Sequence, residues 1–365
     1  MSTSSGRDYQ VIVADENILD PRPCHLFIHP TRCRQTRSEM LSSDHLSLGI
    51  WCFGNKKHTF TGVQQTISEE SLPIKAETSG LTQTLRRHTQ RHACSSLGFY
   101  DDETHQLSNI LGNKSYLRNI YVSERYRTFI CLIPKASSNN WVRALLTLEG
   151  VINSTNTMSP REISWAAQKH LRVLGQFRQN ERIRILRNYT SVIFVRNPYT
   201  RLLSAFRDRL EAYPNRNPTH RRIHNPNIHR KFGNHSPAEM PDPSTPGERY
   251  NVTFKEFVDY YLSGITDVHW REQYKVCPPC LDYDYIGKME SFSEDFDQAV
   301  KIFNASSNVL LITAAHATNS SKDAILRKYY ETLSDLQMEQ LGLLLSSDMS
   351  LFGYLIPGVI QRNKF

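Results

Sequence analysis

Two segments of the sequence place a cation directly after a short apolar run. The run 129–133 leads to Lys135, and the run 191–195 leads to Arg196. Short apolar runs of this kind predict buried strands, and the amphipathic stretches that follow them predict helices. Because the free N–H groups at a helix N-terminus attract anions, each strand-to-helix junction is a candidate phosphate site. Together the two junctions predict binding of a nucleotide with two separated phosphates.

Both junctions carry side chains suited to phosphate oxygens. Lys135 reaches an anion as a mobile point charge, and Arg196 can hold a second phosphate with two parallel hydrogen bonds. The other candidate donor-binding residues are Pro134, Ala136, Ser137, Ser138, Asn139, Asn140, Asn197, Pro198, Arg201 and Ser204. No Gly-x-x-x-x-Gly-Lys pattern surrounds Lys135, which excludes a Walker loop. Taken singly, each junction is also consistent with an ordinary buried strand before a capped helix.

The two junctions resemble the 5'-phosphosulfate loop and the 3'-phosphate motif of Golgi carbohydrate sulfotransferases, in the group of chondroitin, dermatan and HNK-1 sulfotransferases. Two further blocks occur in the family's order. One is Asp-Val-His-Trp-Arg-Glu-Gln-Tyr-Lys-Val-Cys-Pro-Pro-Cys at 267–280, continued by Tyr-Asp-Tyr-Ile-Gly-Lys-Met-Glu at 283–290, and the other is Leu-Phe-Gly-Tyr at 351–354. The resemblance covers about 119–354, and four ordered blocks are far more specific than one.

The resemblance implies transfer of the sulfuryl group of 3'-phosphoadenosine 5'-phosphosulfate (PAPS) to a sugar hydroxyl. Lys135 would neutralise charge on the leaving 5'-phosphate, and Arg196 and Ser204 would hold the 3'-phosphate. Catalysis of such an in-line displacement rests on positioning and charge stabilisation. The favoured acceptor is the 4-hydroxyl of N-acetylgalactosamine in chondroitin or dermatan, followed by the 3-hydroxyl of glucuronic acid.

A sugar hydroxyl is a poor nucleophile, so we expect a base within hydrogen-bond reach. His269 is the first candidate, because the ordinary pKa of histidine lies near neutral pH, and Glu290 is the second. His269 is equally consistent with a packed histidine beside Trp270. The candidate acceptor-binding residues are Arg207, Arg209, Arg271 and Lys275. The sequence shows no cluster of metal ligands, and the proposed chemistry needs no metal.

Length and composition predict one catalytic domain. The chain has 365 residues, of which 39% are hydrophobic, enough for one sizeable core. We expect an α/β domain over 114–365, with a parallel sheet flanked by helices in a P-loop-like arrangement. The region 1–113 is rich in Ser, Thr, His and Arg with weak periodicity, which predicts a stem-like or disordered segment. The expected helices cover about 140–150, 160–177, 200–212, 254–262, 293–303 and 336–345, with a further strand over 309–312.

A formal net charge of +8 favours an acidic partner. The segment 207–235 is basic and loop-like, and it would guide an acidic glycan to the site. Aromatic residues are scarce there, so binding of single-stranded nucleic acid is not favoured. A solvated loop without a ligand is the alternative.

Location is implied by the resemblance, since family members are usually anchored in the Golgi membrane with their catalytic domain in the lumen. No stretch of the sequence approaches the roughly 18 to 20 apolar residues that span a bilayer, and 1–8 lacks the apolar core of a signal peptide. We therefore expect the true start to be missing from the sequence. Glycosylation sequons favour a luminal history; they lie at Asn113, Asn153, Asn188, Asn234, Asn251, Asn304 and Asn319.

Seven cysteines leave at least one thiol free or intermolecular. Cys277 and Cys280 flank two prolines, and we favour a local disulfide or a structural loop there over half of a zinc site or a redox motif. Cys131 lies in an apolar run and is expected to be a buried thiol.

Two other function classes compete with the transferase. A kinase for small molecules would need a glycine-rich loop and an acidic Mg²⁺ partner, and neither is apparent. A non-catalytic glycan-binding protein with a degenerate donor site is the second alternative, because Asn139 stands where the family usually has a hydroxyl residue.

Overall fold

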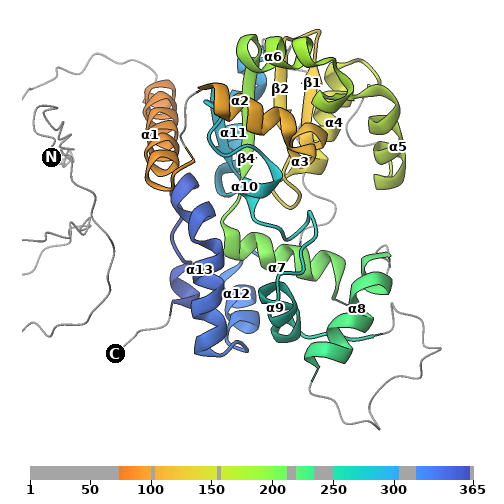
Figure 1. Ribbon diagram of the computed structural model, residues 1–365, viewed down its shortest axis with the longest axis vertical. Helices are drawn as coiled ribbons and strands as arrows, with labels where there is room; N and C mark the ends of the chain where they lie inside the picture. Colours follow the sequence, from red (N-terminus) through yellow and green to blue (C-terminus); the bar gives the residue numbers. More distant parts are fainter. Residues whose placement is uncertain are drawn as a thin grey trace, which may run out of the picture. The chain divides into compact units, whose positions relative to one another are not determined.

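The computed structural model describes residues 74–99, 103–153, 158–211, 219–233, 250–303 and 318–361. Its centre is a five-stranded sheet in the order β3-β1-β2-β4-β5 (Figure 1). The strands are β1 (Ile120–Ser123), β2 (Thr128–Cys131), β3 (Arg172–Val173), β4 (Thr190–Val195) and β5 (Tyr285–Lys288). Strands β2, β4 and β5 run parallel, whereas β1 is antiparallel to both of its neighbours. The prediction of a parallel sheet is therefore wrong for β1, because a hairpin as short as the β1–β2 connection can join only antiparallel strands.

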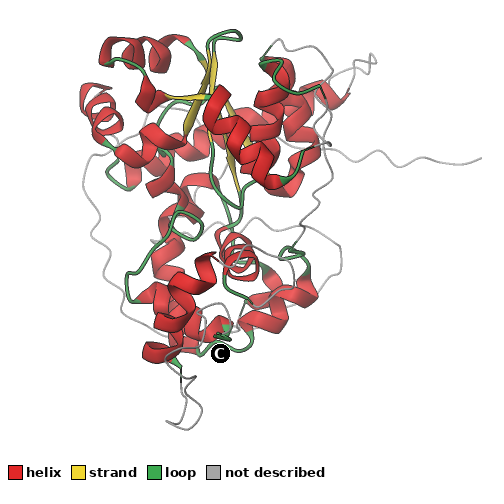
Figure 2. Ribbon diagram, turned by 90° about the vertical axis from the view of Figure 1, so that its right-hand side faces the viewer, coloured by secondary structure: helices red, strands yellow, loops and turns green. Residues whose placement is uncertain are grey.

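Helices flank the sheet on both faces (Figure 2). They are α1 (Ile74–Ser96), α2 (Glu103–Gly112), α3 (Lys114–Asn119), α4 (Ser138–Leu148), α5 (Pro160–His170), α6 (Gln179–Asn188), α7 (Pro198–Arg209), α8 (Thr219–Phe232), α9 (Phe254–Leu262), α10 (Gln273–Val276), α11 (Phe292–Ile302), α12 (Asp323–Tyr330) and α13 (Asp335–Phe352). No helix in these described segments is long and apolar enough to cross a membrane.

Successive side chains of each strand point to opposite faces of the sheet and so divide the hydrophobic core in two. Ile130 and Phe194 pack with α4, α5 and α11 on one face, whereas Phe129 and Ile193 pack with α2, α3 and α6 on the other. A Cβ atom at Gly287 of β5 would come within 2.4 Å of the Phe194 ring. Glycine at this position therefore allows β5 to pair closely beside β4.

A third hydrophobic cluster lies among α7, α8, α9, α12 and α13. Because α7 begins three residues after β4 ends, this helical group adjoins the carboxyl edge of the parallel strands, below the sheet in Figure 1. Ligands of open α/β sheets bind at this edge. The two predicted junctions, β2 to α4 and β4 to α7, both end here.

Part of the region expected to be stem-like is folded. Helix α1 packs along α13, and Gln83 of α1 exchanges two hydrogen bonds with the backbone of Ile286, at 3.1 and 3.0 Å, as a neighbouring strand would. Arg86 pairs with the buried Asp295 at 2.8 Å. The compact unit that contains the sheet spans Glu69–Phe365, so the expected boundary at 113 falls inside it.

Two disulfides join distant segments: Cys94 to Cys280 and Cys131 to Cys277. A local Cys277–Cys280 disulfide and a free Cys131 thiol are therefore wrong. Both bridges anchor the 277–280 loop, the first to the end of α1 and the second to the end of β2. The Cys131–Cys277 bridge lies just before the turn that carries Lys135.

Other differences concern element limits. The helical stretch expected over 160–177 ends at His170, and β3 follows it. The segment 207–235, expected to be loop-like, contains the end of α7 and all of α8. The strand expected over 309–312 lies outside the described residues. The helix predicted over 254–262 coincides with α9, whose Thr253 and Glu256 form a capping box.

Candidate active site

The turn between β2 and α4 has an unusual backbone. Lys135 and Ser137 adopt left-handed conformations, with φ of 71° and 66°. Such conformations cost about 1–3 kcal/mol each and persist where the surroundings impose them, often at ligand sites. Ser137 makes no capping bond to α4, and its buried Oγ has no hydrogen-bond partner among the described residues. This hydroxyl and the first N–H groups of α4 suit the oxygens of an anionic group.

The second junction touches the first. The Arg196 guanidinium donates to the Lys135 carbonyl oxygen at 3.1 Å, to Thr200 Oγ1 at 3.1 Å and to Ser321 Oγ at 2.8 Å. Arg196 is buried, which lowers its pKa to about 10 and leaves it charged at neutral pH. The two predicted cationic turns, which belong to separate strand-helix units, are therefore in direct contact.

Arg201 connects the same turn to the 267–280 block. Its buried guanidinium donates to the carbonyl oxygens of Pro134 at 2.9 Å, Arg271 at 2.6 Å and Val268 at 3.2 Å. Three carbonyl partners satisfy much of the donor capacity of an arginine. Arg201 therefore fixes the position of the turn. Binding sites require such supporting hydrogen bonds to hold their geometry.

The backbone of Arg196 is held by a residue to which the sequence analysis gave no role. Gln273 accepts a hydrogen bond from Arg196 N at 3.0 Å and donates to Arg196 O at 2.9 Å. Helix α10, which carries Gln273, is held in turn by Asp348, which accepts from the N–H groups of Gln273 at 2.7 Å and Tyr274 at 2.9 Å. Burial raises the pKa of Asp348 to about 6. The position of Gln273 in a family block was the only sequence signal for it.

Glu290, the second candidate base, supports the start of α7. One carboxylate oxygen accepts from Asn197 N at 2.9 Å and the other accepts from Tyr354 Oη at 2.8 Å. Asn197 also caps α7 by accepting from Tyr199 N at 3.1 Å. Because both oxygens of Glu290 are engaged, the geometry favours a bracing role over proton transfer.

Ser204, which was predicted to bind the 3'-phosphate, is buried on α7. It lies beside the segment 318–321. Its Oγ is 3.0 Å from Thr318 Oγ1, to which Ser320 Oγ also donates at 2.8 Å. Arg207 donates to the Thr318 carbonyl oxygen. The segment 318–321 therefore contacts both Arg196 and Ser204, a proximity that no local sequence pattern indicated.

The Lys135 side chain turns toward α7. Its Nζ lies 3.0 Å from Asp208 Oδ2, and the same oxygen is 3.1 Å from Arg209 Nε. Burial lowers the pKa of Lys135 to about 8, although the charge of Asp208 opposes this shift. The ammonium group is thus charged at neutral pH but deprotonates more readily than an exposed lysine.

His269 forms a hydrogen-bonded pair with Asp267. Its Nδ1 lies 2.5 Å from Asp267 Oδ1, and its backbone N–H donates to the same oxygen at 2.9 Å. Burial lowers the pKa of His269, although Asp267 opposes the shift, and the positive charges of Arg209 and Lys135 lower it further. The neutral ring then presents Nε2 as a proton acceptor. His220 of α8, which the sequence analysis did not single out, packs edge-on against this ring with centroids 4.6 Å apart.

The four candidate acceptor-binding residues divide in two. Arg207 and Arg209 lie on the last turn of α7; Arg209 shares Asp208 with Lys135, whereas Arg207 pairs with Glu211 at 3.2 Å. Lys275 instead pairs with Glu272 at 3.1 Å, and Arg271 contributes its carbonyl oxygen to Arg201. The structure therefore brings Lys135, Arg209 and His269 together and leaves Lys275 in a separate ion pair.

Comparison with known proteins identifies the family of the chain. Residues 118–355 match the sulfotransferase family. Carbohydrate sulfotransferase 8 of Mus musculus is 28% identical over 338 residues, which is 90% of this chain and 76% of that protein. Carbohydrate sulfotransferase 9 of Homo sapiens is 29% identical over 284 residues, 76% of this chain and 60% of that protein. Carbohydrate sulfotransferase 8 of Homo sapiens is 31% identical over 251 residues, 66% and 57% of the two chains.

No solved structure matches the chain. The family match includes both cationic turns and the blocks around Gln273, Glu290 and Tyr354. The resemblance inferred from the sequence is thereby confirmed: this chain belongs to the sulfotransferase family, and its relatives are carbohydrate sulfotransferases.

Proposed function

We propose that the protein is a PAPS-dependent carbohydrate O-sulfotransferase. The observation that carries the proposal is the 3.1 Å hydrogen bond from Arg196 to the Lys135 carbonyl, because it makes the two predicted phosphate-binding turns neighbours. When bound, PAPS would supply a sulfuryl group that is already activated for transfer. The protein then has to hold two anionic ends, orient the acceptor and take up one proton.

The residues present fit a bisphosphorylated nucleotide. Ser137 Oγ is buried without a partner among the described residues, beside the first turn of α4, and Lys135 is the nearest candidate cation for the 5' end. Arg196 and Ser204 are the candidates for the 3'-phosphate. Their present partners are the hydroxyl groups of Ser321 and Thr318, and hydroxyl groups can bond to phosphate oxygens as readily as to these side chains.

His269 is the proposed base. Because Asp267 accepts from Nδ1, the neutral ring carries its proton there and offers Nε2 to the sugar hydroxyl. Asp267 then stabilises the charge that His269 acquires when it takes the proton. The expected contribution of such a base to the rate is about 10²–10⁴-fold.

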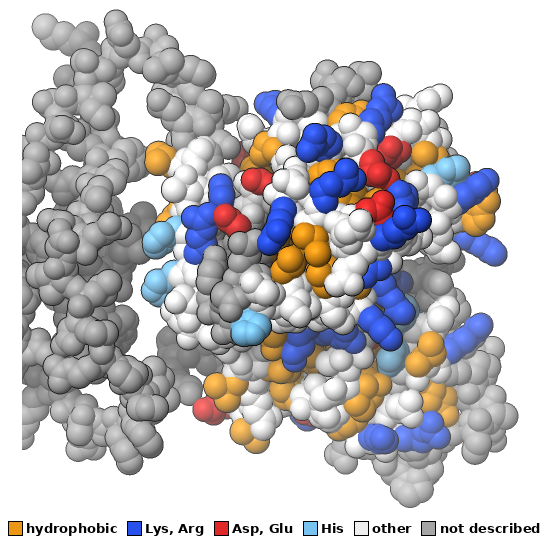
Figure 3. All heavy atoms as spheres, turned by 45° about the horizontal axis from the view of Figure 1, so that its top comes forward, with side chains coloured by type: hydrophobic (Ala, Val, Ile, Leu, Met, Phe, Trp, Pro, Cys, Tyr) orange, Lys and Arg blue, Asp and Glu red, His pale blue; other side chains and the backbone are white. Residues whose placement is uncertain are grey.

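For the acceptor we propose the 4-hydroxyl of N-acetylgalactosamine in chondroitin or dermatan, with the 3-hydroxyl of glucuronic acid as the alternative. The relatives' names support a carbohydrate acceptor, and the net charge of +8 supports an acidic one. Figure 3 shows more Lys and Arg than Asp and Glu side chains on the face in view. Arg207 and Arg209 are the proposed contacts to acidic groups of the glycan. In the Golgi lumen, the proposed location, such glycans are the expected substrates.

The test is transfer of labelled sulfate from PAPS to a panel of desulfated chondroitin, dermatan, heparan and N-linked glycans, followed by mapping of the labelled position. In parallel, binding of 3'-phosphoadenosine 5'-phosphate is measured for the wild-type chain, Lys135→Ala and Arg196→Ala. Nucleotide binding that both substitutions abolish, with label in one glycan, supports the proposal. Glycan binding without nucleotide binding would instead identify a non-catalytic glycan-binding protein.

A further inference from the structure

Three metal-ligand side chains converge beside the proposed base. His220, Asp267 and His269 each offer a ligand atom, and these atoms lie within 4.8 Å of one another. His220 comes from the first turn of α8, whereas the other two come from the loop before α10. All three are partly buried, with side chains 15–26% exposed, so that a small ion can enter from solvent.

The geometry points to a site for a divalent transition ion of the zinc class, and we propose that its occupancy switches the transferase off. His220 Nε2 lies 3.9 Å from Asp267 Oδ1, and two ligands of a tetrahedral zinc ion stand about 3.3 Å apart for bonds near 2.0–2.1 Å. His220 Nδ1 is buried without a hydrogen-bond partner among the described residues. Two imidazoles and one carboxylate suit Zn²⁺, Co²⁺ or Ni²⁺ rather than Mg²⁺ or Ca²⁺, which prefer all-oxygen sites.

The surrounding charges permit a cation there. Lys135 and Arg209 both act electrostatically on His269, and both pair with Asp208, at 3.0 and 3.1 Å. Asp267 supplies a second negative charge as a ligand. The charges of these two cations and two carboxylates cancel before the ion binds, so this group does not oppose the entry of a cation.

The bound ion would inhibit transfer because it binds Nδ1 of His269. The ion replaces the proton between His269 Nδ1 and Asp267 Oδ1, and the N···O distance opens from 2.5 Å to a ligand separation. A metal-bound imidazole stays neutral, so its one proton moves to Nε2. That nitrogen then carries a hydrogen and cannot accept the proton of a sugar hydroxyl. This consequence rests on the proposed function, whereas the binding site itself does not.

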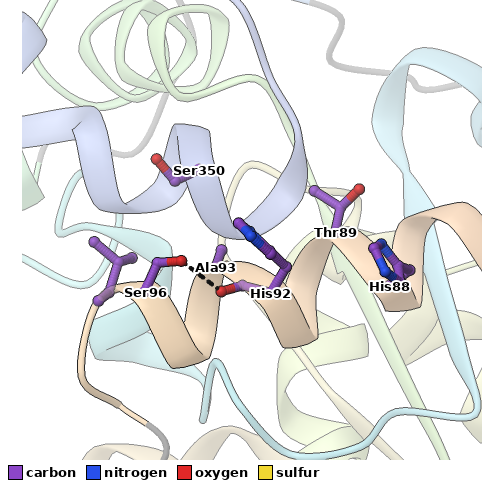
Figure 4. Close-up of a pocket in the computed structure, with 7 residues that line it drawn as sticks. His88, Thr89, His92, Ala93, Ser96 and Ser350 are labelled. Carbon is purple, nitrogen blue, oxygen red and sulfur yellow. Dashed lines mark hydrogen bonds between the residues drawn. The ribbon is translucent and has the colours of Figure 1, made fainter. Parts of the chain in front are cut away.

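The test uses the full chain and Zn²⁺ alone. His88 and His92 lie one turn apart on α1 and line an open pocket with Ser350 (Figure 4). Two histidines at this helical spacing can hold zinc together, so both are replaced by alanine in every sample. The chain with these two alanines is the parent. Zinc binding is measured by calorimetry for the parent and for the parent carrying His220→Ala or His224→Ala. His224, one turn further along α8 and bonded to Tyr260, is the matched control.

The site requires that His220→Ala weaken the binding at least about tenfold, since even outer-shell changes cost 10–100-fold, and that His224→Ala leave it within about twofold. A parent that binds no zinc, or equal binding by His220→Ala, overturns the proposal. If His220→Ala proves unfolded by circular dichroism, Asp267→Asn is judged by the same criterion, because it keeps the shape of the side chain and removes the charge.

The switch has its own readout. The rate of sulfuryl transfer by the parent should fall over the zinc concentrations at which the site fills, and a chelator should restore it. The His220→Ala variant should transfer sulfate at the same rate with and without zinc. Zinc binding without loss of rate overturns the switch. If the chain transfers sulfate to no acceptor, the proposed function fails, and the calorimetric comparison still decides whether the site exists.

Discussion

The proposed role of Lys135 at the 5'-phosphate predicts that donor binding depends on pH. Burial lowers the pKa of its ammonium group to about 8, and only the charged form would attract the 5'-phosphate of the nucleotide. Binding therefore favours proton uptake, and affinity is lost as pH rises through the pKa of the free protein. With a pKa of about 8, the charged fraction falls about tenfold between pH 7 and pH 9, which corresponds to about 1.4 kcal/mol of binding free energy.

The assay is calorimetric titration with 3'-phosphoadenosine 5'-phosphate from about pH 6.5 to 9.5. Each titration is repeated in two buffers of different ionisation enthalpy, which reports proton uptake directly. Lys135→Arg is the matched variant, because a guanidinium stays charged throughout this range. Its affinity should stay flat where the affinity of the wild-type chain falls.

Asp208→Asn tests the same reasoning from the other side. Asp208 raises the pKa of Lys135 against the effect of burial, so its removal should move the fall in affinity to lower pH. If the wild-type chain and Lys135→Arg lose affinity in parallel, another group controls binding and the argument is refuted. A shift to higher pH in Asp208→Asn would refute it equally.

Three further outcomes are expected. His269→Gln should lower kcat by about 10²–10⁴-fold, whereas Glu290→Gln, which keeps an acceptor oxygen, should stay within about tenfold; the reverse order would make Glu290 the base. Gln273→Leu should lower the free energy of unfolding by about 1–3 kcal/mol, because it leaves buried polar groups unpaired; denaturant unfolding measures this loss. The same substitution should weaken nucleotide binding, and unchanged binding would show that Gln273 does not support the site. Cys131→Ser should lower the free energy of unfolding by up to about 5 kcal/mol, because the Cys131–Cys277 bridge joins residues 146 apart in the sequence. In a reductant the variant and the wild-type chain should unfold alike, and a difference that survives there would show another cause.

The two cationic turns of the candidate site could be predicted because their sequence signals are local. Lys135 and Arg196 each follow an apolar run within a few residues, so strand, turn and cation appear together in the sequence. Gln273 gives no such signal, because its contact with Arg196 spans 77 residues. The same reason hid the disulfide partners of Cys277 and Cys280, since a fold must exist before their spacing is known.

Helix α1 shows why the folded unit was predicted too short. Leu81 and Leu85 lie on its exposed side, 72% and 66% exposed, while the polar Gln83 and Arg86 bond to Ile286 and Asp295 on the inner side. Exposed leucines and inward-facing polar residues in this half of the helix blur the helical period on which a sequence prediction depends. The helix is defined by tertiary contacts, including the bridge from Cys94, rather than by its own pattern.

Charge balance links the two halves of the proposed mechanism. Asp208 compensates Lys135 and Arg209 before a donor arrives, and it keeps the lysine protonated in a buried position. An incoming phosphate must take Lys135 from Asp208, because one ammonium group cannot serve both anions at full strength. The carboxylate so released stays beside Arg209, on the turn of α7 proposed to meet the acidic glycan. Donor binding would therefore weaken the pull of Arg209 on an acidic acceptor, and Asp208→Asn should strengthen acceptor binding most in the donor-bound state.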